Sequence, residues 1–244
     1  MRFSVFALAS IPDTATTRRL FDLHDLDDRS VAKVLAQRRR LQTGSSEELR
    51  WDQRAIAAIT LIQHSIDNLS IESLNFAEHT EQDMLQAFYR SVLRTGHMVS
   101  WDAEQRGLPL IHFRTLMQHV SYPTYWQALR ERGDLHLDLC AWLSPARSDR
   151  PTLDDLARRL GLPGMLGRDE DGVIDAWLQG RPADVQAFSD IAALNAYLIA
   201  LQLFTTTGEI TRHDNARIQV LLRDRLRRND STHLADFLGA WGEV

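Results

Sequence analysis

The stretch LHLDLCAWLSPARSDRPTLDDLARRLGLPGMLG, residues 135–167, holds three structural signals in succession. Residues 135–144 alternate apolar and polar side chains and then break, which predicts a strand followed by a turn. Residues 152–162 predict a helix that Thr152 caps and Gly161 ends. The Gly-Leu-Pro-Gly segment after this helix contains a proline, so we interpret it as a turn and not as a phosphate-binding loop.

Strand and helix signals continue on both sides of this unit. Residues 55–63 and 68–76 predict two strands joined by a short turn, an antiparallel hairpin. Further strands are expected over 2–9 and 97–101. Helices are expected over 30–42 (capped by Ser30), 78–94, 109–119 and 183–206, with two more after residue 212.

The order of these elements predicts an α/β fold. Strands that alternate with helices, together with one hairpin, are typical of a mixed sheet flanked by helices. We expect residues 1–208 to form this domain. Residues 209–244 are expected to form a C-terminal helical extension packed on the same domain.

The composition fits a soluble globular protein. The chain has 244 residues, of which 44% are hydrophobic and 25% charged. Its single cysteine, Cys140, excludes an intramolecular disulfide and fits a core residue of a cytoplasmic protein. No apolar run approaches the roughly 20 residues that span a bilayer, so no membrane association is expected.

The net charge of −5 predicts no strong basic field around the whole chain. Many nucleic-acid binders carry such a field. Binding of this kind would depend on local patches, namely Arg38, Arg39 and Arg40, or Arg223, Arg225, Arg227 and Arg228. The alternative is that both patches are solvated helix faces.

Four stretches, in order, resemble one protein family. They are SVFALASIPDT (4–14), MVSWDAEQRGLPLIHFRTL (98–116), the stretch 135–167 and AFSDIAALNAYLIALQLF (187–204). They are similar to predicted 3′–5′ exonucleases related to the proofreading domain of family-B DNA polymerases, a branch of the DEDD nucleases of the DEDDy type. The resemblance implies a ribonuclease H-like fold over most of residues 1–208, although the segment 15–50 matches poorly.

The resemblance also implies a mechanism with physical demands. Such enzymes hydrolyse phosphodiesters with two divalent cations, Mg²⁺ or Mn²⁺, that generate hydroxide and stabilise the charged transition state. Mg²⁺ prefers oxygen ligands, chiefly carboxylates. The family supplies Asp-x-Glu on the first strand, an Asp two positions before a helix-opening proline, and Tyr-x-x-x-Asp on a late helix. The spacings of two and four place each pair on one face of its strand or helix.

Every one of these positions has lost its polar group. The strand pair corresponds to Ala7 and Ala9, the second motif to Gly107, and the helix pair to Phe188 and Ala192. None of these side chains can hold Mg²⁺. We therefore expect no catalytic residue, no metal and no cofactor, and we interpret the chain as a catalytically degenerate 3′–5′ exonuclease-like protein.

Nearby acids leave one alternative open. Asp102 and Glu104 precede Gly107 and could reach the site, which would make the protein an active metal-dependent exonuclease with a rebuilt site. Asp13 follows the first strand, but the family has it beside intact catalytic acids, so it is not a replacement. Asp190 lies about 200° around the helix from Ala192 and is expected to face away.

Three further groups of residues are candidates for the remaining cleft. His136 and Asp138 lie two apart, which allows a His–Asp pair near the cleft or a structural role in which Asp138 bonds backbone amides. Asn195 belongs to the scaffold around the last motif. Among the aromatic residues that could stack on bases, Trp101 also suits the core, whereas Trp51 has no such assignment. Partial exposure is expected for Tyr122, Tyr125 and Trp126.

The cleft is therefore expected to bind a single-stranded nucleic-acid end or a protein partner without hydrolysis. A purely protein-interaction module is a further alternative, because the acidic net charge disfavours contact with phosphates.

Overall fold

The fold is built on a mixed sheet with the strand order β3-β2-β1-β4-β5. The computed structural model describes residues 2–65, 68–144 and 150–242, within which five strands form the sheet. The β1–β2 and β2–β3 pairs are antiparallel, whereas β4 is parallel to β1 and to β5. The expected mixed sheet and hairpin are confirmed. The strands are β1 (Phe3–Pro12), β2 (Arg54–Ser65), β3 (Asn68–Asn75), β4 (Met98–Ser100) and β5 (His136–Asp138).

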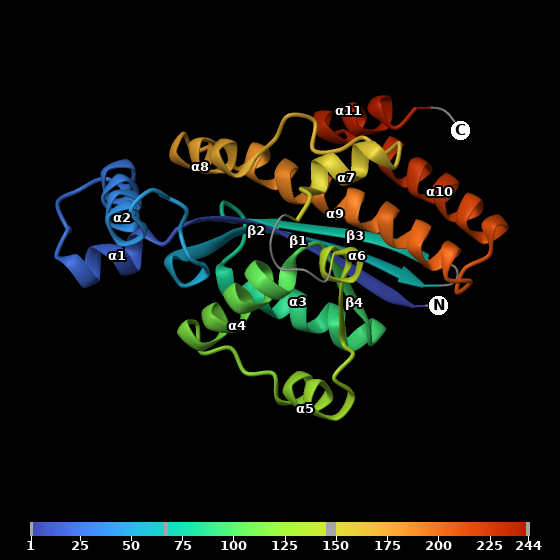
Figure 1. Cartoon of the computed structure of the whole chain (residues 1–244), viewed down its shortest axis with the longest axis horizontal. Helices are drawn as coiled ribbons and strands as arrows, with labels where there is room; N and C mark the ends of the chain where they lie inside the picture. Colours follow the sequence, from blue (N-terminus) through green and yellow to red (C-terminus); the bar gives the residue numbers. More distant parts are fainter. Residues whose placement is uncertain (1, 66–67, 145–149, 243–244) are drawn as a thin grey trace.

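Helices cover both faces of the sheet (Figure 1). One face carries α3 (Glu81–Thr95), α4 (Leu108–Met117) and α5 (Pro123–Arg132). The other carries α7 (Leu153–Arg159), α8 (Glu170–Leu178) and α9 (Pro182–Thr206), with α10 (Arg212–Arg227) and α11 (Thr232–Ala240) beyond α9. Strand β1 serves both cores because its side chains point alternately to opposite faces. This arrangement is consistent with the expected α/β ribonuclease H-like fold.

Helix α9 runs through the core. It is long and apolar enough to cross a membrane, but most of it is buried between the sheet and its neighbouring helices. That burial is typical of the core helix of a soluble domain. The buried side chains of Ile218, Leu222 and Leu226 on α10 and of Phe237 on α11 belong to the same apolar core.

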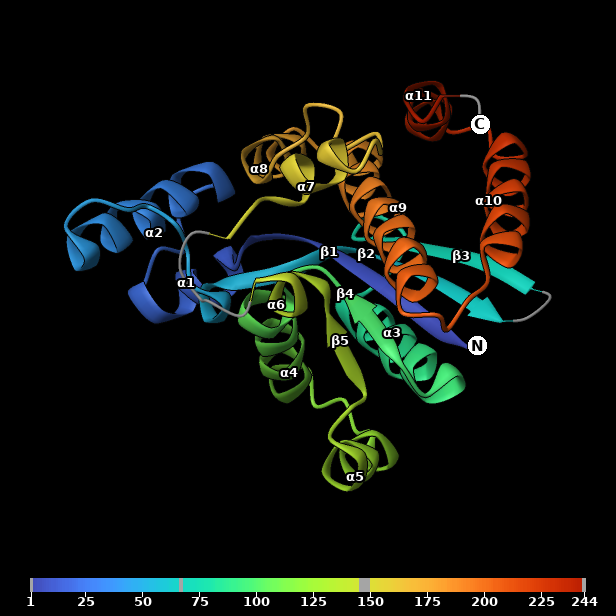
Figure 2. The same ribbon diagram turned by 45° about the vertical axis from the view of Figure 1, so that its right-hand side comes forward.

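Two helices between β1 and β2, α1 (Thr14–Phe21) and α2 (Asp28–Thr43), stand away from this body (Figures 1 and 2). The predicted cap of the second helix is wrong: Asp27 is the cap, and its carboxylate accepts the Ser30 N–H at 2.8 Å. Helix α1 was not predicted because its threonines are poor helix formers. Asp13 supports it by accepting the Thr16 N–H at 3.0 Å.

Three other segments differ from the prediction. Residues after β5 form a short helix, α6 (Leu139–Leu143), and not only a turn, because the Asp138 carboxylate caps it. The expected loop before Pro109 contains a π-helical turn, Ala103–Gly107, that leads directly into α4. Helix α8 has no counterpart in the prediction; Asp169 caps it by accepting the Gly172 N–H at 2.8 Å.

Candidate functional site

The positions of the lost motifs gather around one cleft. Ala7, Gly107, Phe188 and Ala192 line this cleft, which has a volume of about 1040 Å³. Its other walls come from the segment 46–54 before and into β2, the segment 150–154 and the loop before α8. Strand β1, the start of α4 and α9 therefore meet where the sequence places the motifs.

Ala9 lies beneath the cleft and has no exposed surface. It packs in a small apolar cluster with Ala57, Ala58 and Val185, and Phe188 packs against the same cluster. The pairing of β1 with β2 shifts register between Ala9 and Ser10. Such bulges are common beside active sites. Here the space next to the bulge is filled by apolar side chains.

Gly107 faces Phe6 and Leu8, which line the cleft together with it. A Cβ added there would lie 3.2 Å from the Ala103 Cβ, 3.6 Å from a ring carbon of Phe6 and 3.8 Å from a methyl group of Leu8. Phe6 and Leu8 belong to the core under α3 and α4. A carboxylate at position 107 would start in contact with apolar groups.

The residues present do not fit the pair of cations that the family mechanism implies. Among residues 2–65, 68–144 and 150–242, no group of three or more His, Cys, Asp or Glu side chains could hold a metal ion. Divalent cations such as Mg²⁺ are held by carboxylate and other oxygen ligands. The replaced positions supply methyl groups, a hydrogen and a phenyl ring instead.

The nearby acids are engaged elsewhere or turned away. Asp102 lines the cleft, but its carboxylate pairs with Arg150 at 2.9 Å and with Arg106 at 3.7 Å. Glu104 is exposed and lies outside the cleft lining. The buried carboxylate of Asp190 faces away, as its helical position predicts: it accepts the Thr60 hydroxyl at 2.6 Å and contacts His233 Nε2 at 2.8 Å. Of the two acids that the sequence offers as replacements, only Asp102 lines the cleft, and one such carboxylate is too few for a two-metal site.

His136 and Asp138 do not bond each other. The buried Asp138 carboxylate accepts the N–H groups of Asp102, Glu104 and Cys140, each at 2.9 Å, and so ties the cleft turn to α6. The His136 ring stacks on Phe88, and its Nε2 lies 2.9 Å from the Tyr125 hydroxyl. The geometry gives Asp138 the role of bonding backbone amides.

Asn195 fixes the turn that the sequence singles out. Its side chain donates to the Gly164 carbonyl at 2.8 Å and accepts the Gly164 N–H at 3.1 Å. Gly164 has a φ of +71°, and a Cβ there would lie 2.4 Å from an Asp154 oxygen. Only glycine suits such a position. Asn195 thus fixes the turn after α7 to α9, and it is fully buried, so it offers no surface to a ligand.

Asp13 is part of a buried ion-pair group at the end of β1. Arg114 contacts the Asp13 carboxylate at 2.5 Å and also pairs with Glu81. Burial alone would lower the pKa of Arg114, but the Glu81 and Asp13 carboxylates raise it above its ordinary value. This group joins β1, α3 and α4 and lies outside the cleft lining.

The aromatic candidates divide into core and cleft residues. The expected partial exposure of Tyr125 is wrong: it is fully buried because its hydroxyl lies within 3.0 Å of His112 and 2.9 Å of His136. Tyr122 and Trp126 are half-buried. Trp101 is half-buried and lines the cleft, and Trp51 lines it with 41% of its surface exposed.

Six arginines line the cleft, and of these the sequence had indicated only Arg39, as part of the patch Arg38, Arg39 and Arg40. They come from segments far apart in the chain, so no local sequence pattern predicts that they lie together. Arg39 and Arg168 make no ion pair within the part of the chain that the structure describes. In the described ranges the cleft is lined by Arg39, Arg50, Arg54, Arg106, Arg150 and Arg168, with Glu48, Asp102, Asp154, Asp169 and Glu170 among them.

Arg106 links three walls of the cleft. Its guanidinium contacts Glu48 at 2.8 Å, Glu170 at 3.1 Å and Asp102 at 3.7 Å. The Arg106 side chain is 57% exposed. Exposed ion pairs contribute little stability and are weakened by salt. An incoming anion can therefore compete with these carboxylates for Arg106.

Buried histidines near the sheet predict a loss of stability in acid. His64 lies under α9 with its Nδ1 2.9 Å from the Tyr197 hydroxyl, and burial lowers its pKa from 6.5 to about 4. As the pH falls below 6.5, the unfolded chain binds a proton that the folded protein refuses, and the difference is complete near pH 4. We expect a loss of about 3 kcal/mol of unfolding free energy over this window from His64. Urea titrations at pH 7.5 and pH 4.5 give the loss of unfolding free energy between these two pH values, and this loss should be smaller in His64→Gln than in the wild type. Equal losses in the two proteins would contradict the assignment to His64.

Comparison with known proteins gives one family match. Residues 46–241 match the model of a family described as "Predicted 3'-5' exonuclease related to the exonuclease domain of PolB". The match includes Gly107, Phe188 and Ala192 but begins after β1, so it leaves Ala7 and Ala9 outside. No curated protein matches the chain.

Proposed function

Because the chain belongs to the family of predicted 3′–5′ exonucleases related to the exonuclease domain of PolB, we propose that its cleft binds single-stranded nucleic acid without hydrolysing it. The expected family is thereby confirmed. The loss of hydrolysis and the identity of the ligand go beyond family membership and are argued separately below.

One observation carries the proposed loss of hydrolysis: the cleft persists, but the five positions that would hold or orient metal ligands present no oxygen. Ala9 is enclosed by apolar side chains, and Gly107 faces Phe6 and Leu8. Phosphodiester hydrolysis by two metals needs the cations to stabilise both the attacking and the leaving oxygen. A cleft that cannot hold them retains only its binding surface.

The lining supports nucleic acid as the ligand. Arginine guanidinium groups suit phosphate oxygens because they donate several hydrogen bonds in a fixed plane. Trp51 and Trp101 add aromatic faces on the same cleft, and stacking on bases contributes roughly 1–3 kcal/mol per base in single-strand binders. Basic grooves interleaved with aromatic residues are typical of proteins that bind single strands.

Arg168→Glu tests this proposal. Arg168 lines the cleft and has no carboxylate partner among the described residues, so its charge is available to a phosphate. We expect the variant to bind a 5′-fluorescein single-stranded oligonucleotide about tenfold more weakly at low salt, since a charge-assisted hydrogen bond is lost. Fluorescence anisotropy measures the dissociation constant.

Two variants serve as controls in that titration. Arg159→Glu makes the same charge change on the exposed end of α7, outside the cleft, and is expected to bind as the wild type does. Glu170→Gln removes a competitor for Arg106 and is expected to tighten binding. Absence of binding by the wild-type protein at low salt would contradict the proposal and leave a protein partner as the occupant. Equal losses of affinity for Arg168→Glu and Arg159→Glu would show that the strand does not bind in the cleft, which would also contradict the proposal.

A further inference from the structure

The helical insertion between β1 and β2 has a charge opposite to that of the chain. Residues 14–43 carry seven basic and four acidic side chains, a net charge of +3 in a chain whose net charge is −5. The acids lie between positions 22 and 28, around the connection of α1 to α2. Positive side chains continue along α2 to its C-terminal end.

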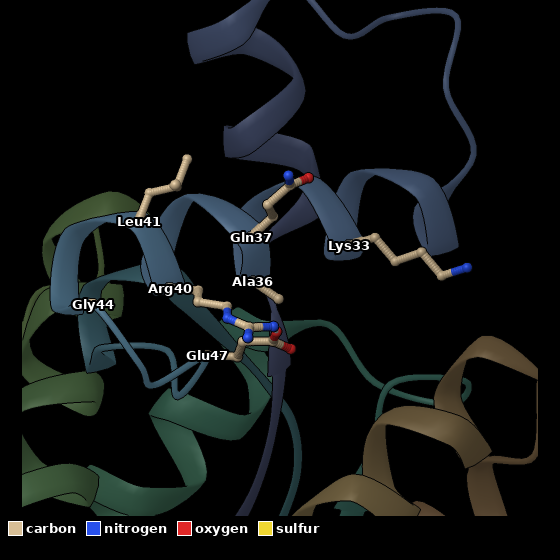
Figure 3. A pocket seen from close by; sticks show the side chains of 7 residues that line it. All are labelled: Lys33, Ala36, Gln37, Arg40, Leu41, Gly44 and Glu47. Atoms are coloured by element: carbon tan, nitrogen blue, oxygen red, sulfur yellow. The ribbon is translucent and has the colours of Figure 1, made fainter.

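The cations of α2 are presented to solvent. Arg29, Lys33, Arg38 and Arg40 are exposed; within the described residues neither Arg29 nor Lys33 forms an ion pair, whereas Arg40 pairs with Glu47 at 3.4 Å. Arg29, Lys33 and Arg40 are spaced by four and seven residues, which places them on one face of the helix. Lys33, Gln37 and Arg40 line a pocket of about 630 Å³. Figure 3 shows their side chains along α2, with Arg40 beside Glu47.

A neighbouring face of α2, about 100° around the helix axis from Arg40, reaches the cleft. Arg39, on the same helix, lines the cleft together with Glu48, Arg50 and Trp51 from the segment that follows α2. Helix α2 has 16 residues and is therefore about 24 Å long. A strand that leaves the cleft past Arg39 meets a row of cations that is long enough for several phosphates.

We infer that α2 is a second nucleic-acid surface, which binds the phosphate backbone of the ligand outside the cleft. This inference rests on the proposed function, because it concerns the part of the same molecule that the cleft does not enclose. Phosphate contacts are independent of sequence and release counterions, so they add affinity that falls with salt. The affinity for a strand should therefore depend on its length.

A double variant separates this surface from the cleft. Arg29→Glu with Lys33→Glu reverses two exposed charges on α2. Arg225→Glu with Arg228→Glu makes the same change in the last turn and at the C-cap of α10, a helix at the opposite end of the molecule from α2 (Figures 1 and 2). Fluorescein-labelled single-stranded DNA of about 6 and about 30 nucleotides serves as the two probes, because only the longer strand can occupy cleft and helix together. Thermal melting checks that both variants are folded.

The expected result is that the α2 variant binds the longer strand about tenfold more weakly, with a salt dependence reduced by about 1.4 in the log–log slope for two lost contacts. Its affinity for the short strand and the affinity of the α10 variant for both strands should match the wild type. An unchanged affinity of the α2 variant for the longer strand, while Arg168→Glu still weakens both probes, would overturn this inference and leave the proposed function intact. Equal losses for the α2 and α10 variants would also overturn it. If the wild-type protein binds neither probe, the proposed function and this inference both fail.

The amine of Lys33 offers a second readout, because Lys33 is the only lysine in the sequence. We expect the longer strand, and not the short one, to slow acetylation of Lys33 by an N-hydroxysuccinimide ester, as measured by mass spectrometry. Equal protection by polyglutamate would assign the surface to an acidic protein and overturn the inference.

Discussion

Arg114→Met is expected to destabilise the protein by about 3–5 kcal/mol, because it leaves two buried carboxylates without their cation. Arg114 is 7% exposed and pairs with Asp13 and Glu81, which are 5% and 12% exposed. Glu81 also accepts the Ile56 N–H at 2.8 Å, so the group connects α3 and α4 to β2 as well as to β1. Urea denaturation followed by circular dichroism gives the free energy of unfolding.

A surface ion pair provides the matched control. Arg181, the N-cap residue of α9, pairs with Asp184 in the first turn of that helix, and both side chains are 49% exposed. Arg181→Met is expected to cost less than about 1 kcal/mol because water already solvates both charges. The double variant Arg114→Met with Glu81→Gln should regain part of the loss. A cost for Arg114→Met as small as that for Arg181→Met would show that the buried group contributes little.

Restoration of a lost acid is expected to damage the fold rather than restore a site, and we expect the largest effect at position 9.

Ala9→Glu is expected to lower the free energy of unfolding by at least about 3 kcal/mol. Ala9 is 0% exposed among apolar side chains, so the new carboxylate would be overpacked and would lack a partner. Burial would raise the pKa of the new carboxyl group, so the loss should shrink as the pH falls and the group becomes neutral. Urea titrations at pH 7.5 and pH 5 measure both effects.

Ala7→Glu is the matched control, because Ala7 lies on the same strand but lines the cleft and is only half-buried. Its new carboxylate can reach water, so we expect a cost of about 1 kcal/mol. Similar costs at both positions would show that room for an acid persists beneath the cleft. That result would contradict the interpretation that apolar side chains leave no room for a carboxylate at position 9.

The sequence predicts the layers of this fold well because its strongest periodic signals lie in the core. The β-branched and aromatic residues of β1 and the long apolar run of α9 are read directly from the chain, and both elements lie where the family resemblance requires. Helix α1 was missed because its stability depends on a cap from Asp13 and on contact with α2. Helix propensity alone does not favour the run of threonines that forms it.

The candidate site divides in the same way. The five replaced positions could be found from sequence because each belongs to a local motif of fixed spacing. The sequence offered Arg39 as part of a basic patch, but it could not show that Arg39 meets Arg106 and Arg168, because these come from three segments that approach one another only in the folded chain. Burial of Tyr125 was likewise hidden, since it depends on bonding to two histidines from different elements.

Incubation of the protein with 5′-fluorescein single-stranded DNA or RNA in Mg²⁺ or Mn²⁺ tests binding without hydrolysis most directly. Anisotropy and a denaturing gel of the same sample report binding and strand length together. We predict that the strand is bound and keeps its full length with either cation. Shortened products that require the cation and disappear in the Asp102→Asn variant would contradict this prediction, because a contaminating nuclease would not respond to that substitution.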